Sequence, residues 1–201
     1  MTIIKKKLLI QETIAEEVEV EWWVEPHLSL HIIVGYPNLN ESFGKLYWRL
    51  DDPAGKNIIN FDINRYSGLI EMIELIVYNG TLERKNENHK THSISTRIGA
   101  VKIDTNIWTK EYKDVHPMAE LLPFPRAEKF VDFPGKPQIQ VGSEELRIEL
   151  FNEPICHQIL MSEDLALELN SSDEVCAVNL MGFTGKYRKL FLEGYKKRLG
   201  K

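Results

Sequence analysis

The 201-residue sequence has only two cysteines, Cys156 and Cys176, and it lacks the C-x-x-C spacing of a zinc knuckle. Two thiols in a chain of this length make no disulfide framework, which favours a reducing compartment. No apolar run approaches the ~18 residues that a membrane helix needs, and the run after Lys7 is too short for a signal peptide. The sequence therefore predicts a cytosolic protein.

The motifs of common enzyme classes are missing as well. The sequence has no G-x-S-x-G, H-E-x-x-H, G-x-G-x-x-G or G-x-x-x-x-G-K-[ST] pattern. Adjacent carboxylates occur, but thirty acidic residues produce such pairs freely. Both cysteines lie in apolar strand patterns, which are typical of buried side chains. We therefore predict no catalytic residue and no cofactor.

The histidines do not form a metal-binding pattern. His27 and His31 fall in a segment that alternates like a strand, where residues four apart stand ~13 Å from each other. They are expected to face solvent or a sheet edge. His89 and His92 lie in the polar stretch NENHKTHS, where a metal would need a third ligand from elsewhere in the fold. We predict no metal site.

Basic residues are scarce in the body of the chain. The whole sequence has 25 basic and 30 acidic residues, a net charge of −5. Residues 1–7 hold three lysines, and residues 186–201 hold seven basic residues and one acid. Residues 8–185 are left with fifteen basic and twenty-nine acidic residues, a balance of −14. This balance predicts a basic protein partner, no nucleic acid and no membrane, although acidity also serves solubility alone.

Residues 17–36, EVEVEWWVEPHLSLHIIVGY, alternate between acidic and apolar side chains at their start. Alternation of period two predicts a strand whose two faces differ, with Trp22 and valines on the core face. The other face is the predicted partner-binding site and consists of Glu17, Glu19, Glu21, Trp23 and Glu25. An aromatic side chain among carboxylates is typical of a binding hot spot. The alternative is that a helix or the chain's proline-rich connection covers Trp23.

Most of the remaining sequence also alternates. Runs of β-branched and aromatic residues, bounded by turn residues, predict strands within 28–32, 44–52, 57–64, 69–78, 91–104, 139–151, 157–161, 165–170 and 174–183. Residues 185–201 have helical spacing instead, with one apolar stripe that is expected to dock on the body, formed by Leu190, Phe191, Tyr195 and Leu199. We therefore predict an α+β fold, a mostly antiparallel β-sheet with a C-terminal helix.

The chain is expected to form a single domain over residues 1–201. Five of the nine prolines fall within 117–137, among interleaved phenylalanines. Proline fixes φ and removes a donor, so this segment is predicted to be an extended connection that packs against the body. It would join two candidate sub-units, 1–116 and 138–201. The sequence does not set the oligomeric state.

A weak internal repeat links the two parts. FDINRYSGLIEMIELIVYNG and LELNSSDEVCAVNLMGFTG align with a one-residue gap, which matches Asn64 with Asn170 and Tyr78 with Phe183. The match indicates two related β-hairpin units, by duplication or by chance from shared alternation. The first hairpin resembles hairpins of small uncharacterised bacterial proteins, among them immunity proteins that neutralise polymorphic toxins. This resemblance implies a cytosolic acidic protein that masks a basic toxin active site, and it transfers no site residues.

Charge and resemblance agree on function, because nuclease toxins need positive charge to bind their substrate. We therefore predict a non-enzymatic, cytosolic binding protein with an acidic surface, in its sharpest form an immunity protein that inhibits a basic toxin. One alternative is a small hydrolase that uses His89, His92 and carboxylates. Another is a structural subunit that assembles through exposed strand edges.

Overall fold

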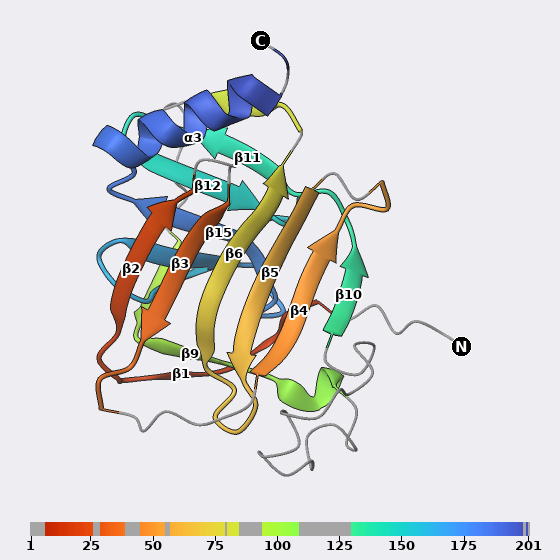
Figure 1. Cartoon of the computed structure of the whole chain (residues 1–201). Helices are drawn as coiled ribbons and strands as arrows, with labels where there is room; N and C mark the ends of the chain where they lie inside the picture. The colour runs from red at the N-terminus through yellow and green to blue at the C-terminus, as the bar shows by residue number, and fades with distance from the viewer. Residues whose placement is uncertain are drawn as a thin grey trace.

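The computed structural model describes residues 7–25, 29–38, 45–54, 57–78, 80–84, 94–108, 130–198 and 200. It confirms a mostly antiparallel β fold with a C-terminal helix (Figure 1). Some predictions fall outside the described residues, namely those for His27, His89, His92, segment 109–129 and Leu199.

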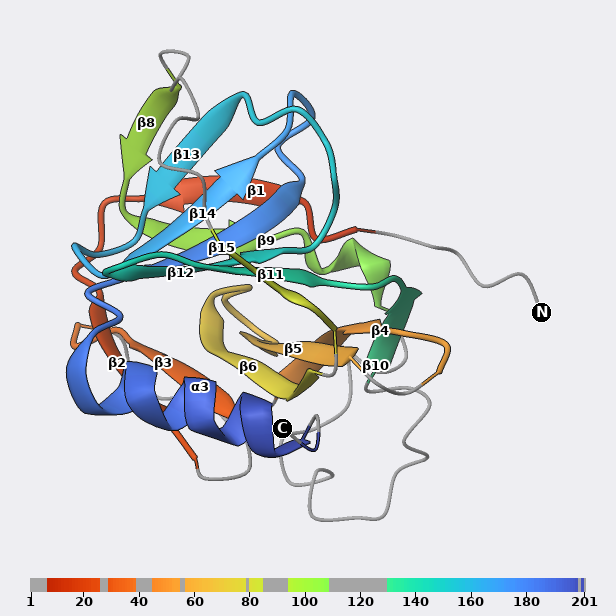
Figure 2. The ribbon, with the colours of Figure 1, turned by 90° about the horizontal axis from the view of Figure 1, so that it is seen from above.

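Two sheets are stacked face to face (Figure 2). The first sheet has the order β10 (Phe130–Pro134), β4 (Lys45–Asp51), β5 (Asn57–Asn64), β6 (Ile70–Tyr78), β3 (Leu30–Gly35) and β2 (Glu19–Val24). The second sheet has the order β7 (Leu82–Arg84), β11 (Gln138–Val141), β12 (Glu145–Glu149), β15 (Val175–Met181), β14 (Leu165–Leu169), β13 (His157–Leu160) and β8 (Ser95–Ile98). The other elements are a ribbon of β1 (Ile10–Ile14) and β9 (Ala100–Ile103), a short 3-10 helix at Thr105–Ile107 and helix α3 (Gly185–Arg198).

The core lies between the sheets, where the alternation places the apolar side chains. One row of paired positions crosses the first sheet through Trp22, Ile32, Ile73, Phe61 and Trp48. The matching row in the second sheet contains Ile139, Ile148, Val178, Leu167 and Ile159. All except Trp22 are at most 1% exposed. Each such side chain stabilises the fold by roughly 1.5–3 kcal/mol.

The two sheets are built on one plan. The order β4-β5-β6-β3-β2 in the first sheet is repeated as β13-β14-β15-β12-β11 in the second. The hairpins β5–β6 and β14–β15 have the same register shift, after Asp62 in one and after Glu168 in the other. In both turns the aligned asparagine, Asn64 or Asn170, accepts backbone N–H bonds from residues that follow it. The aligned hairpins therefore share a register as well as a sequence pattern.

The β1–β9 ribbon closes one end of the sandwich and follows the same symmetry. The Ile103 N–H donates to Gly68 O at 2.8 Å in the first hairpin, and the Ile10 N–H donates to Asp173 O at 2.9 Å in the second. Gly68 and Asp173 occupy equivalent turn positions, with φ of 75° and 57°. Ile10 pairs with Ile103 in the ribbon, so an approximate two-fold axis passes between these two residues.

Helix α3 docks on the body through most of its predicted stripe. Phe191 is fully buried and packs edge-to-face on Phe183, with ring centroids 5.5 Å apart. Leu190 and Tyr195 are partly buried against the same core. Tyr187, which lies outside the predicted stripe, packs there too. The helix therefore lies across the end of the sandwich opposite the β1–β9 ribbon (Figure 1), from Trp22 of β2, which packs on Tyr187, to the end of β6, where the Tyr195 hydroxyl donates to Gly80 O.

The candidate sub-units do not each form one sheet, because both edge strands of the second sheet, β7 and β8, come from residues 1–116. Strand β8, from residues 1–116, pairs parallel with β13, and β10, from the proline-rich segment 117–137, pairs parallel with β4. The described end of this connection is thus extended, and it is part of the first sheet. The division into sub-units 1–116 and 138–201 stays a prediction.

Candidate functional site

The five residues of the predicted binding face, Glu17, Glu19, Glu21, Trp23 and Glu25, are here called the acidic strip. Its four glutamates are exposed and Trp23 is half-buried. Within the described part of the chain, β2 is the last strand of the first sheet. The strip therefore runs along the rim of that sheet (Figure 1), on the face turned away from the core.

Behind the strip lies an imidazole between two carboxylates. Trp23 stacks on His31, with ring centroids 5.0 Å apart and an interplanar angle of 14°. His31 Nδ1 lies 3.0 Å from Glu74 Oε1, and His31 Nε2 lies 3.5 Å from Glu25 Oε1. Burial raises the pKa of Glu74, His31 counteracts this rise, and the charges of Asp62 and Glu25 add to it. Both ring nitrogens therefore face acids, with Glu74 the nearer, and Nε2 is buried without a hydrogen-bond partner among the described residues.

A further carboxylate, Asp62, is buried under the same face. It is 3% exposed, pairs with Lys45 Nζ at 3.2 Å and accepts a hydrogen bond from Asn60 Nδ2 at 2.6 Å. Burial raises the pKa of Asp62, and the bonds from Lys45 and Asn60 offset that rise only in part. Burial is therefore the main cause of the raised pKa of both Asp62 and Glu74.

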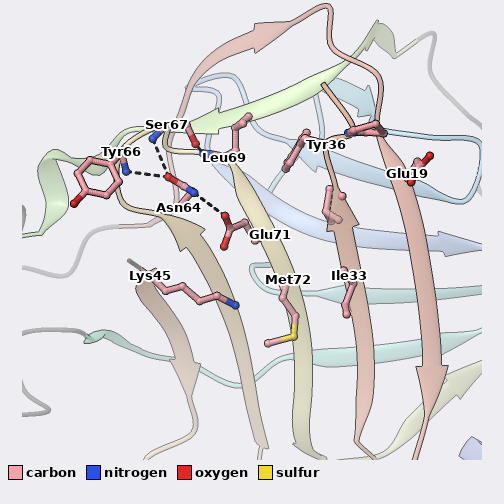
Figure 3. A pocket seen from close by; sticks show the side chains of 13 residues that line it. Glu19, Ile33, Tyr36, Lys45, Asn64, Tyr66, Ser67, Leu69, Glu71 and Met72 are labelled. Carbon is pink, nitrogen blue, oxygen red and sulfur yellow. Dashed lines mark hydrogen bonds between the residues drawn. The ribbon is translucent and has the colours of Figure 1, made fainter. Parts of the chain in front are cut away.

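A hollow of about 870 Å³ opens on the outer face beside the strip (Figure 3). Glu19 of the strip lines one side, and Ile33, Met72 and Lys45 line it from neighbouring strands. Tyr66, from the turn between β5 and β6, is 54% exposed and Ile33 is 39% exposed. An apolar surface next to acids suits Lys or Arg side chains, whose stems are aliphatic and whose ends are charged.

Hydrogen bonds fix the end of the hollow. Asn64 Nδ2 donates to Glu71 Oε1 at 2.6 Å, and the Tyr36 hydroxyl donates to Ile70 O at 2.5 Å. Burial raises the pKa of Tyr36, and the nearby Glu71 charge raises it further, so this hydroxyl stays a donor. The lining is thus held in place by the turn itself rather than by a ligand.

The equivalent place in the second sheet holds a closed ion-pair network. By register, Arg147 corresponds to His31 and Glu168 to Asp62. Arg147 pairs with Glu168 at 2.8 Å and with Glu149 at 2.5 Å, and the three side chains are 12–14% exposed. There one arginine pairs with two carboxylates and no hollow adjoins them among the described residues, whereas in the first sheet the pair of Lys45 and Asp62 lies beside a hollow that Lys45 lines.

Among the described residues, the cysteines and the metal-ligating side chains give no competing site. Cys176 is buried, and burial raises the pKa of its thiol to about 11, as suits a small core side chain. Cys156 is half-buried. Within the described ranges, no cluster of three or more His, Cys, Asp and Glu side chains is arranged to hold a metal ion. No helix in those ranges is long and apolar enough to cross a membrane.

Sequence reasoning locates the strip but misses the residues behind it. The alternation predicts that His31 faces solvent or a sheet edge; it does lie on the outer face, but Trp23 stacks against it. The alternation alone does not place Glu74 and Asp62 at the site, because both come from other strands of the sheet. One signal was available, because Asn60 and Asp62 alternate with apolar residues in a strand that is otherwise core-like.

No protein-family model matches the chain, and comparison with the curated proteins gives no match. The likeness of the first hairpin to immunity-protein hairpins therefore stays a prediction. Function has to be argued from the geometry and charge of the site, since a fold alone does not define one.

Proposed function

We propose that this chain is a cytosolic, non-enzymatic binding protein whose acidic strip takes a basic protein, as an immunity protein takes a toxin. The observation that carries the proposal is a row of exposed glutamates with the half-buried Trp23 in its midst. Exposed charges steer a partner of opposite sign into place, and a central aromatic side chain holds it after encounter. The strip combines both elements on one strand.

The groups behind the strip favour the same partner chemistry. Glu74 and Asp62 both have raised pKa values because burial disfavours their charged forms. A lysine or arginine from the partner would stabilise these charges, and its stem would lie along Ile33 beside the hollow. A nuclease toxin offers such residues, because it needs positive charge to bind phosphates.

The test is protection in living cells. The chain is co-expressed with the product of the neighbouring gene where that product is a basic toxin, and growth is measured. Wild type restores growth, whereas the double variant Glu19→Gln/Glu21→Gln and the variant Trp23→Ala lose protection. The matched control is Glu144→Gln/Glu163→Gln, which removes two exposed charges outside the strip. Full protection by both strip variants would contradict the proposal.

A further inference from the structure

The backbone of β2 points half of its hydrogen-bonding groups away from β3. The Glu25 N–H donates to Ser29 O at 2.8 Å, so these residues form a hydrogen-bonded pair at the end of the antiparallel ladder. Such pairs alternate along a ladder. The Glu21 N–H and C=O therefore face β3, whereas those of Val20 and Trp22 face the rim of the sheet. Within the described residues, no strand pairs with that rim.

In the second sheet, the edge that corresponds to this rim is paired with a strand. The strand equivalent to β2 in the second sheet is β11, and its outer edge carries β7 in parallel, with Ile139 beside Leu82. The chain that follows the first hairpin, β5–β6, forms β7, whereas the chain that follows the second hairpin, β14–β15, forms α3. Tyr187 of α3 and residues 20–23 line a hollow of about 570 Å³. Val20 and Trp22 are half-buried, and the hollow lies along this edge of β2, whose counterpart in the second sheet is paired.

The charge of the strip selects the occupant. A second copy of this chain would set carboxylates opposite carboxylates, which destabilises strand pairing. We propose that the edge of β2 takes an extended basic segment of the partner protein as an added strand, parallel to β2 as β7 is to β11. Lysine or arginine side chains of that segment then lie beside Glu19 and Glu21. This inference rests on the proposed function and adds the backbone contacts to it.

The geometry fixes which amides of the added strand bind β2. In parallel strands, residues that show their side chains on the same face point their N–H groups in the same direction. The side chain of Glu21 is on the outer face and its N–H points from β2 toward β3. The added strand lies on the opposite side of β2, so its basic residues, whose side chains are also on the outer face, point their N–H groups toward β2. The intervening residues point theirs to solvent.

The experiment uses a short synthetic peptide in which lysine alternates with threonine. Two further versions carry a methyl group on the backbone amide nitrogen, one at every lysine and the other at every threonine. All three carry the same charge. At low ionic strength we expect methylation of the lysine backbone amides to weaken binding on the order of tenfold. Methylation of the threonine backbone amides should change the affinity little. Amide exchange of Val20 and Trp22 slows on binding of the unmethylated peptide, whereas that of Glu21 changes little.

The outcomes separate this inference from the proposed function. If all three peptides bind equally and Glu19→Gln/Glu21→Gln weakens each of them, strand addition is refuted while the acidic strip is supported. If threonine methylation alone weakens binding, the parallel arrangement is overturned. If the glutamine variant binds as wild type does, or no peptide binds, the proposed function itself fails.

Discussion

Replacing Phe191 by alanine tests whether α3 is part of the core. Phe191 is fully buried and meets Phe183 edge-to-face at 5.5 Å, with an interplanar angle of 84°. Removing a buried phenylalanine side chain costs ~3–5 kcal/mol, from lost burial and from the cavity that remains. For a chain of this length, 1 kcal/mol corresponds to ~2–4 °C in Tm. The variant should therefore melt roughly 6–20 °C below wild type.

The assay is urea unfolding, followed by circular dichroism and by tryptophan fluorescence. Trp22 reports on the helix because its ring lies 5.2 Å from that of Tyr187, a residue of α3. The control is Lys189→Ala, on the same helix with its side chain 75% exposed, which should stay within ~0.5 kcal/mol of wild type. A loss below about 1 kcal/mol for Phe191→Ala would show that the helix rests on the body without stabilising it, and would refute the reasoning.

Four further substitutions, measured by urea unfolding, test the two sheets and the first hairpin turn. Arg147→Ala leaves two poorly exposed carboxylates without their cation and should cost ~3–5 kcal/mol, whereas the equivalent His31→Ala should cost less than half as much; equal losses would contradict the contrast between the sheets. Gly68→Ala should cost ~1–3 kcal/mol, because φ is 75° and the new Cβ would meet Ile103 O at 2.9 Å; an unchanged midpoint would be the adverse result. Asp62 has a raised pKa in the folded state, so the folded form binds the proton more tightly and stability falls as pH rises above the usual value of 3.8. Asp62→Asn should therefore flatten the dependence of unfolding free energy on pH. An unaltered slope would contradict the claim that burial raises the pKa of Asp62 in the folded state.

Much of the fold is predictable because period-two alternation is strong along the chain. The alternation around Trp22 places it toward the core and Trp23 on the outer face, as found. Strand β10 escaped prediction as a strand because Pro134 lies in it and because its partner, β4, is distant in the sequence. Strands that pair only through distant contacts carry little local signal.

The site is less predictable than the fold, because it depends on register. Trp23 meets His31 only when β2 and β3 pair as they do, and Glu74 joins them from the next strand. A shift by one residue would send each of these side chains to the other face. The hairpin alignment, by contrast, could be read directly, since Asn64 and Asn170 mark turns of the same kind.

The most direct test of the acidic strip is the rate of association with the basic product of the neighbouring gene, measured by stopped flow at low and high ionic strength. Wild type should associate quickly at low salt and much more slowly at high salt, because exposed charges are screened. Glu19→Gln/Glu21→Gln should associate more slowly at low salt, on the order of tenfold, with a weaker dependence on salt. Trp23→Ala should mainly dissociate faster. Association of the glutamine variant at the wild-type rate, with the same salt dependence, would contradict the account.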